Sequence, residues 1–161
     1  MESRAKLFGH PIHQMLIVFP LGLLATSLFF DVIAVAAGHE ALFQASYYMI
    51  AAGVISALLA AVFGLIDFLA IPNGTRAKRI GYMHGGGNLA LVALFAVSWF
   101  LRRGHITEPG TLAIVLSGIG ASLGAVTGWL GGELVDRLGV GIDDGANLDA
   151  PSSLTHDRVR R

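Results

Sequence analysis

Four long apolar stretches constrain this chain more than any other feature of its sequence. They run from Met15 to Ala37, from Ala45 to Ile71, from Leu89 to Leu101 with a softer lead-in over Ile80–Asn88, and from Thr111 to Leu134. Each reaches the roughly 20 residues that a helix needs to span a bilayer. With 54% hydrophobic and 14% charged residues, the chain is too apolar for an ordinary soluble surface. The sequence therefore predicts an all-α, four-helix transmembrane bundle with up-down-up-down topology.

Short breaks between these stretches set the domain organisation. The breaks contain residues that end helices, namely Gly38, the run Pro72-Asn73-Gly74, and Gly104 with Pro109. The apolar pattern stops after Gly139, and the residues beyond it are mostly polar. We predict a four-span membrane domain at residues 1–142 and a peripheral polar tail at residues 143–161, because such a tail buries little apolar surface.

The charge pattern excludes one class of function and predicts an orientation. Eleven basic and eleven acidic residues balance, and no basic patch alternates with aromatic residues, so we expect no nucleic-acid partner. Six basic residues near the membrane ends lie on the side of both termini, against Arg102 and Arg103 on the other side. The six are Arg4, Lys6, Arg76, Lys78, Arg79 and Arg137. The asymmetry predicts a multi-pass protein of the cell (inner) membrane with both termini in the cytoplasm.

Polar residues gather at the predicted cytoplasmic ends of all four spans. They are His10 and His13 at the start of the first span, Asp67 near the end of the second, His84 and Asn88 at the start of the third, and Trp129, Glu133 and Arg137 at the end of the fourth. Residues three or four apart share one helical face, so each helix can point polar groups toward one shared layer. Charges in or near hydrocarbon are costly, and a buried cluster implies either mutual pairing or a ligand.

This layer is the predicted cofactor or metal site. Histidine and carboxylate are ligands that zinc, iron and manganese accept, and facing histidines also bind haem axially in helix bundles. Because the chain has no cysteine, thiolate ligands are excluded. The predicted metal ligands are His10, His13, Asp67, His84 and Glu133. For a haem or transition-metal cofactor, the predicted binding residues are His10, His13, His84 and Asn88.

A structural reading of the same residues stays open. Asp67 could pair with Arg79, and Glu133 could pair with Arg137, while Trp129 could serve as an interfacial anchor. In that case the polar layer would lock the bundle together without binding a ligand.

Asp31 is expected far from this layer. It lies 18 residues after His13, or about 27 Å along a helix, which puts it at the opposite membrane face. There it pairs with Arg102 or Arg103, or stays hydrated beside the outer-loop residues His39, Glu40 and His105. His156 lies in the polar tail, where we expect no specific role.

Small residues predict close helix packing. In the fourth span Gly120, Gly124, Gly128 and Gly132 recur every four residues and leave a ridge without side chains along one helix face. Such a ridge lets another backbone approach closely. Packing inside the bundle is the favoured use, and a homodimer through the same four glycines is the alternative.

Three segments also carry longer motifs. The first motif is Gly9-His10-Pro11-Ile12-His13-Gln14-Met15-Leu16, followed by Phe19-Pro20-Leu21-Gly22. The second runs from Phe63-Gly64-Leu65-Ile66-Asp67-Phe68 to Ile71-Pro72. The third is Gly128-Trp129-Leu130-Gly131-Gly132-Glu133-Leu134-Val135, with Gly139-Val140-Gly141 after it. Over roughly Leu7 to Ile142 the chain resembles an uncharacterised bacterial family of four-span proteins, the domain of unknown function 2231. The resemblance implies the fold class and a membrane location. Some relatives are joined to Rieske-type iron–sulfur domains, which hints at membrane electron transfer.

The leading functional hypothesis is a membrane redox protein that holds haem or a transition metal near the cytoplasmic face and exchanges electrons with a redox partner protein. The first alternative is a small proton- or metal-coupled transporter in which the histidines and carboxylates form a titratable relay. The second is a non-catalytic membrane scaffold. No nucleophile, base and substrate pocket can be assembled from the sequence, so we do not predict an enzyme.

Overall fold

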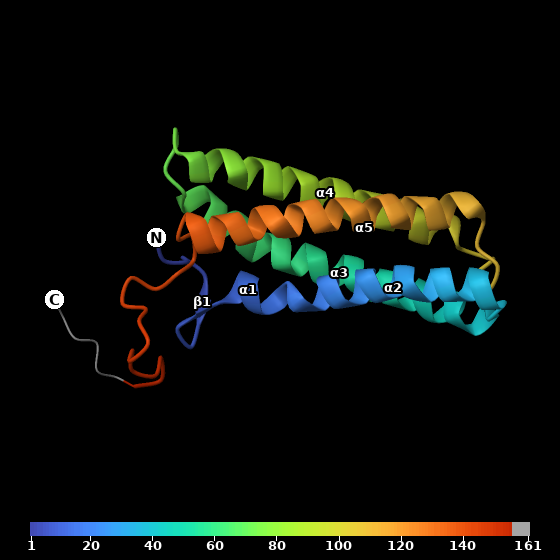
Figure 1. Ribbon diagram of the computed structural model, residues 1–161, viewed down its shortest axis with the longest axis horizontal. Helices are drawn as coiled ribbons and strands as arrows, with labels where there is room; N and C mark the ends of the chain where they lie inside the picture. The colour runs from blue at the N-terminus through green and yellow to red at the C-terminus, as the bar shows by residue number, and fades with distance from the viewer. Residues whose placement is uncertain (156–161) are drawn as a thin grey trace.

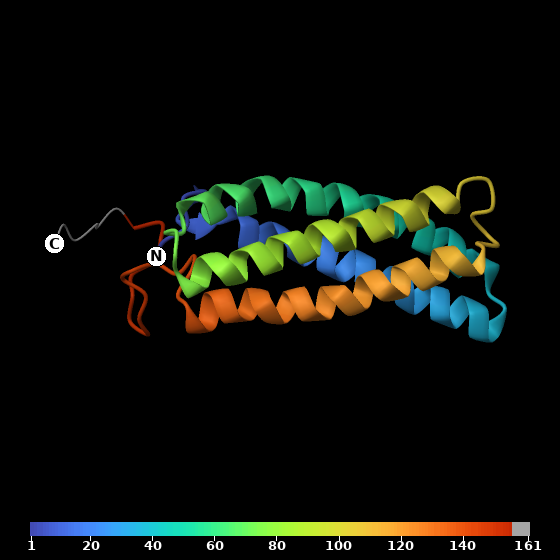
Figure 2. The same cartoon turned by 90° about the horizontal axis from the view of Figure 1, so that it is seen from above.

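Four long helices lie side by side along the length of the molecule in the computed structural model, which describes residues 1–155 (Figures 1 and 2). The first span is a broken helix, and the fourth ends in a π-helix. The helical elements are α1 (Ile12–Leu16), α2 (Val18–Ala37), α3 (Glu40–Ala70), α4 (Arg76–Leu101), α5 (Thr111–Gly132) and the π-helix η1 (Glu133–Arg137). The predicted all-α class with four membrane-spanning helices is confirmed, because four helical segments are long and apolar enough to cross a membrane.

The connectors alternate between the two ends of the bundle (Figure 1). The links between α2 and α3 and between α4 and α5 lie at one end. The link between α3 and α4 lies at the other, with the N-terminus and the segment after η1; we call this the terminal end. Helix α2 stops at Gly38, whose φ of 70° is a left-handed conformation that glycine adopts without steric cost. Thr75 caps the start of helix α4, because its side chain accepts a hydrogen bond from the backbone N–H of Lys78 at 3.1 Å.

A small hairpin precedes the first helix and corrects one prediction. Strands β1 (Lys6–Leu7) and β2 (His10–Pro11) pair in antiparallel fashion, and His10 pairs with Leu7. His10 therefore lies in a strand before α1 and shares no helical face with His13. The helix then breaks between α1 and α2 at Ile17, three residues before Pro20, which cannot donate a backbone hydrogen bond to the preceding turn.

The bundle has a narrow core and an apolar outer surface. Leu24, Ile50, Leu91 and Phe95 form the buried hydrophobic cluster, one from each of α2 and α3 and two from α4. Many other large apolar side chains, such as Leu21 at 66% and Leu69 at 67% exposure, point outward. An outward apolar face is what a helix in lipid presents, since the hydrocarbon solvates it.

A buried polar layer joins all four spans near the end of the bundle opposite the terminal end. Arg102, which follows α4, donates two hydrogen bonds to the Asp31 carboxylate of α2, at 2.8 and 2.6 Å. Both side chains are 0% exposed. The remaining guanidinium N–H groups donate to three serine hydroxyls, at 3.3 Å in each case: Ser46 of α3, Ser98 of α4 and Ser117 of α5. Of the alternatives for Asp31, the pairing with Arg102 is the one that occurs.

The glycine ridge of α5 divides into two parts. A Cβ atom at Gly120 would lie 2.9 Å from Cε2 of Phe95, and one at Gly124 would lie 2.9 Å from Cδ1 of Leu91, so both glycines pack inside the bundle against α4. A Cβ at Gly128 or Gly132 would meet nothing within 4 Å. Internal packing thus accounts for the first two glycines, and a homodimer contact through the other two stays a prediction.

We predict that Asp31→Asn destabilises the protein by about 3–5 kcal/mol, because it leaves the Arg102 charge buried without its counter-ion. The double variant Asp31→Leu with Arg102→Met removes both charges and should recover most of that loss. The free energy of unfolding can be measured by titration with SDS while circular dichroism reports the helices. A double variant as unstable as Asp31→Asn would show that the uncompensated charge is not the cause.

We predict that Gly120→Ala lowers the free energy of unfolding by about 1–3 kcal/mol, because the added methyl group collides with the fully buried Phe95 ring. Gly118→Ala is the matched control, since a Cβ there meets nothing within 4 Å. The same SDS titration compares the two variants. Equal stability of both would mean that α4 and α5 do not pack closely at Gly120.

Candidate functional site

His13 is fixed against α3 near the terminal end. Its Nδ1 atom lies 2.8 Å from the backbone oxygen of Ala60. Gly64, one turn further along α3, makes the room for the ring, because a Cβ atom there would lie 2.8 Å from Cε1 of His13. A carbonyl oxygen only accepts hydrogen bonds, so Nδ1 carries the proton in the neutral ring and the lone pair is on Nε2.

His84 is held in the same way against α5. Its Nδ1 atom lies 2.8 Å from the backbone oxygen of Thr127. A Cβ atom on Gly131, again one turn further, would lie 3.1 Å from Cε1 of the ring. Each helical hairpin thus carries one half-buried imidazole on its first helix, bonded to a carbonyl of its second helix and seated beside a glycine.

Asn88 completes the surroundings of His84. Its amide nitrogen lies 3.2 Å from Nε2 of His84 and 2.9 Å from the His84 backbone oxygen. Its amide oxygen accepts a hydrogen bond of 3.1 Å from the Thr127 hydroxyl. These contacts agree with a lone pair on Nε2 of His84, because the Asn88 amide is a donor there. Nothing in the sequence distinguishes Thr127 from the other threonines, because its contacts with His84 and Asn88 depend on its position opposite α4 in the folded bundle.

The other predicted ligands lie with other partners. Glu133 pairs with Arg76 at 2.5 Å, and the exposed His10 has its Nε2 atom 3.2 Å from the Ser153 hydroxyl. Asp67 accepts hydrogen bonds from the N-terminal segment. Within residues 1–155, no group of three or more histidine, aspartate or glutamate side chains is placed to hold a metal ion. Of the five predicted metal ligands, His13 and His84 share one kind of setting, because each has its Nδ1 atom against a backbone carbonyl of a neighbouring helix.

Two alternative pairings from the sequence are corrected by this geometry. Glu133 pairs across the bundle end with Arg76 at the start of α4, and not with Arg137 in its own π-helix. Asp67 has Ser3, Arg4 and Ala5 as partners, and not Arg79. In both cases spacing along the sequence suggested a neighbour, whereas the tertiary fold supplied a closer partner. His156 lies outside the described residues.

Comparison with protein-family models gives one match, to a family of predicted membrane proteins designated DUF2231, over residues 9–144. The chain belongs to this family. No curated protein and no solved structure matches it. The family assignment agrees with the four apolar helices of the structure and with the expected membrane location.

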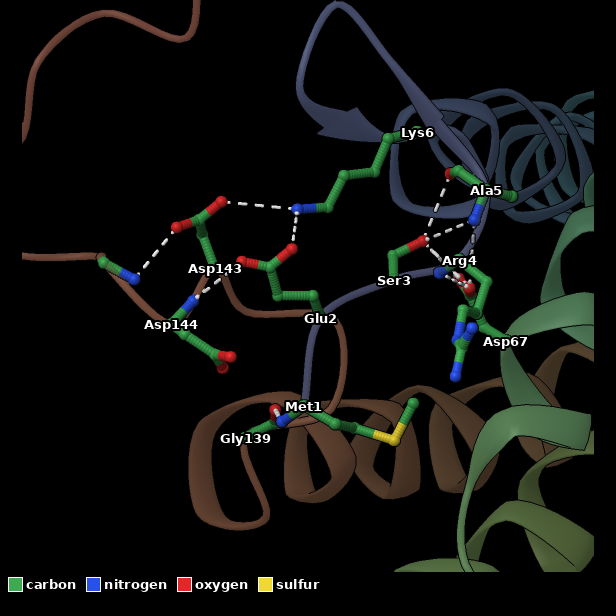
Figure 3. Close-up of polar contacts among 11 residues, drawn as sticks. Met1, Glu2, Ser3, Arg4, Ala5, Lys6, Asp67, Gly139, Asp143 and Asp144 are labelled. Atoms are coloured by element: carbon green, nitrogen blue, oxygen red, sulfur yellow. Dashed lines mark hydrogen bonds and ion pairs between the residues drawn. The ribbon is translucent and has the colours of Figure 1, made fainter. Parts of the chain in front are cut away.

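The six residues Met1–Lys6, which precede the part of the chain matched by the DUF2231 family model, cross the terminal end of the bundle, and we call them the N-terminal strap. Figure 3 shows how the strap reaches Asp67 near the end of α3. The Ser3 hydroxyl lies 2.9 and 2.7 Å from the two carboxylate oxygens, and the backbone N–H of Arg4 donates to Asp67 at 2.7 Å. The Ala5 N–H adds a longer bond of 3.4 Å. Ser3 is buried in this contact, which nothing in the sequence pattern predicted.

The strap also binds the segment that follows η1 (Figure 3). Lys6 bridges two carboxylates, Glu2 at 2.7 Å and Asp143 at 3.3 Å. The hydrogen bond from Lys6 lowers the pKa of Glu2 below its ordinary 4.5. The pKa of Asp143 lies below its ordinary 3.8, mainly because of the hydrogen bond from the backbone N–H of Gly145 and secondly because of the hydrogen bond from Lys6. The bond to Glu2 in turn raises the pKa of Lys6 above 10.5. These bridges therefore stabilise the strap fully between pH 4.5 and 10.5.

We predict that acid weakens the strap. Carboxylates with a lowered pKa contribute stability above their ordinary pKa and lose it as the pH falls through the lowered value. Lys6→Met should raise the pKa of Glu2 and Asp143, while Lys6→Arg should keep both lowered. A pH titration of the side-chain carboxyl carbons by NMR measures these values. Unchanged midpoints in Lys6→Met would show that Lys6 does not hold the two carboxylates in solution.

Proposed function

We propose that this membrane protein binds a haem iron or a transition-metal ion through Nε2 of His13 and Nε2 of His84, in a membrane electron-transfer role. One observation carries the proposal: each Nδ1 atom is 2.8 Å from a backbone carbonyl. Metal-bound histidines commonly donate their other ring N–H to such an acceptor, which fixes the tautomer and orients the ring. Both imidazoles are therefore oriented as ligands before any metal binds.

The donor set favours a site with two protein ligands. Two imidazole nitrogens would suit haem iron, or a metal ion that takes its remaining ligands from water or substrate. His10, Asp67 and Glu133 have other partners within residues 1–155 and are not needed for this site. Asn88 supports it by holding the region around Nε2 of His84, and its amide would give way there to a bound metal. The bound group would supply a reversible change of oxidation state.

A scaffold without a cofactor is the second candidate. It is favoured by the polar groups that pair among themselves, namely Arg102 with Asp31, Arg76 with Glu133, and Asp67 with the N-terminal strap. Such pairing stabilises the bundle whether or not a metal binds. The two candidates therefore differ in what the paired histidines do.

We also propose that the terminal end faces the cytoplasm of a cell with this protein in its inner membrane. The positive-inside rule supports this orientation, because six basic residues lie near the membrane at the terminal end. At the other end, the charge of Arg102 is balanced by Asp31 inside the bundle, which leaves Arg103 as the basic residue near that surface. The histidine pair then lies toward the cytoplasmic side.

The full chain, purified in detergent, tests the metal or haem site. We expect stoichiometric binding of hemin, giving the absorption bands of six-coordinate haem, or of a redox-active ion, Cu²⁺ or Co²⁺, measured by elemental analysis after removal of excess metal. His13→Ala and His84→Ala should each abolish this binding. His10→Ala is the matched control and should bind like the wild type, because His10 is exposed in β2.

Two results would contradict the proposal. The first is a wild-type protein that binds none of these groups, which leaves the scaffold as the better account. The second is a loss of binding in His10→Ala equal to that in His84→Ala, which would indicate adventitious surface binding. Circular dichroism of each variant separates loss of the site from loss of the fold.

A further inference from the structure

A depression lies at the terminal end of the fourth span, and neither His13 nor His84 is among its lining residues. Its volume is about 320 Å³, and its lining residues are Trp129, Gly132, Glu133, Asp136 and Arg137. Four of these five residues lie in η1 or next to it. The π-helical turn is closed by the Leu138 N–H, which donates to the Glu133 carbonyl at 3.1 Å, five residues back. Single π-helical turns of this kind are rare and occur often at functional sites.

The depression lies at the depth of the lipid headgroups. The fourth span runs over Thr111–Arg137 and is long and apolar enough to cross a membrane, so Arg137 marks its end. Trp129 is 67% exposed although it lies only two turns before that end. Tryptophan is enriched at this level of the membrane, where the ring contacts both acyl chains and headgroups. A lipid next to α5 would thus place its glycerol and phosphate region beside the depression.

Both signs of charge line this depression. Glu133 is paired with Arg76, and its side chain is only 17% exposed. Asp136 and Arg137 are exposed, and within residues 1–155 neither makes a side-chain hydrogen bond or an ion pair. Within residues 1–155, a carboxylate and a guanidinium without side-chain partners therefore line the depression together with a second carboxylate and an indole. The complementary ligand has a cation and an anion a few atoms apart.

We propose that this depression binds the headgroup of a phospholipid with a primary ammonium, such as phosphatidylethanolamine. The ammonium donates hydrogen bonds to the carboxylate of Asp136, and the phosphate accepts hydrogen bonds from Arg137. The acyl chains lie along the exposed face of α5 below Trp129. A choline headgroup cannot donate such bonds, and a glycerol headgroup carries no cation for the carboxylates. This site does not depend on the histidine pair.

Native mass spectrometry of the full chain in detergent tests the site directly. The probes are dioleoyl phosphatidylethanolamine, phosphatidylcholine and phosphatidylglycerol, each titrated separately. We expect phosphatidylethanolamine to bind more tightly than either other lipid by about 10-fold, the difference of one charge-assisted hydrogen bond. A preference for phosphatidylcholine, or equal binding of all three lipids, would overturn the proposal and leave Trp129 as a plain interfacial anchor.

Variants locate the two halves of the headgroup. Asp136→Asn should weaken phosphatidylethanolamine by about 3- to 10-fold while leaving phosphatidylglycerol as tight or tighter, because only the ammonium loses a partner. Arg137→Gln should weaken all three lipids, because they share the phosphate. Asp149→Asn is the matched control, since it removes an exposed carboxylate outside the depression and should change nothing. A loss in Asp149→Asn equal to that in Asp136→Asn would mean that net charge alone governs lipid binding, and would contradict the site.

Discussion

The guanidinium of Arg102 is the constraint on which the arrangement of the spans depends. It donates to Asp31 of α2, Ser46 of α3 and Ser117 of α5, and also to Ser98 of its own helix. In the interior of a membrane protein an unpaired guanidinium or carboxylate is costly, so the two charges must meet and their remaining donors must find hydroxyls. Hydrogen bonds are directional, and they fix the axial position of all four helices at one end of the bundle.

With that end fixed, small residues set the approach of the helices toward the other end. Gly53 faces Leu24, and Gly120 faces Phe95, so each hairpin closes around a glycine in its second helix. Lipid surrounds the outer faces and provides no hydrophobic force between helices, which leaves close packing and hydrogen bonds to hold the hairpins. Near the terminal end, Gly64 leaves room for the ring of His13, and Gly131 leaves room for the ring of His84, because neither glycine has a side chain. The position of each imidazole therefore depends on close helix packing at a glycine as well as on its hydrogen bond to a carbonyl.

The terminal end combines features with different physical demands. His13 and His84 are half-buried between helices, where backbone carbonyls orient their rings. The N-terminal strap and the η1 depression lie at the end of the bundle, where water and headgroups compete for each charge. Asp67 and Glu133 illustrate the boundary between the two. Each was a candidate ligand, and each is bound instead by a segment at the bundle end, Asp67 by the strap and Glu133 by Arg76.

The sequence by itself determined what depends on distance along one helix. Apolar length set the four spans, and the rise per residue placed Asp31 at the depth of Arg102 and far from His13. Which partner each polar group takes was decided only by the tertiary structure. The sequence placed Arg102 and Arg103 at the same membrane depth as Asp31 and so could not choose between them. The strap that binds Asp67 is not helical, so no periodic pattern in the sequence predicted its contact. The physical reason is that hydropathy reports depth in the membrane, whereas pairing depends on helix rotation and on irregular backbone, which form only when the helices pack.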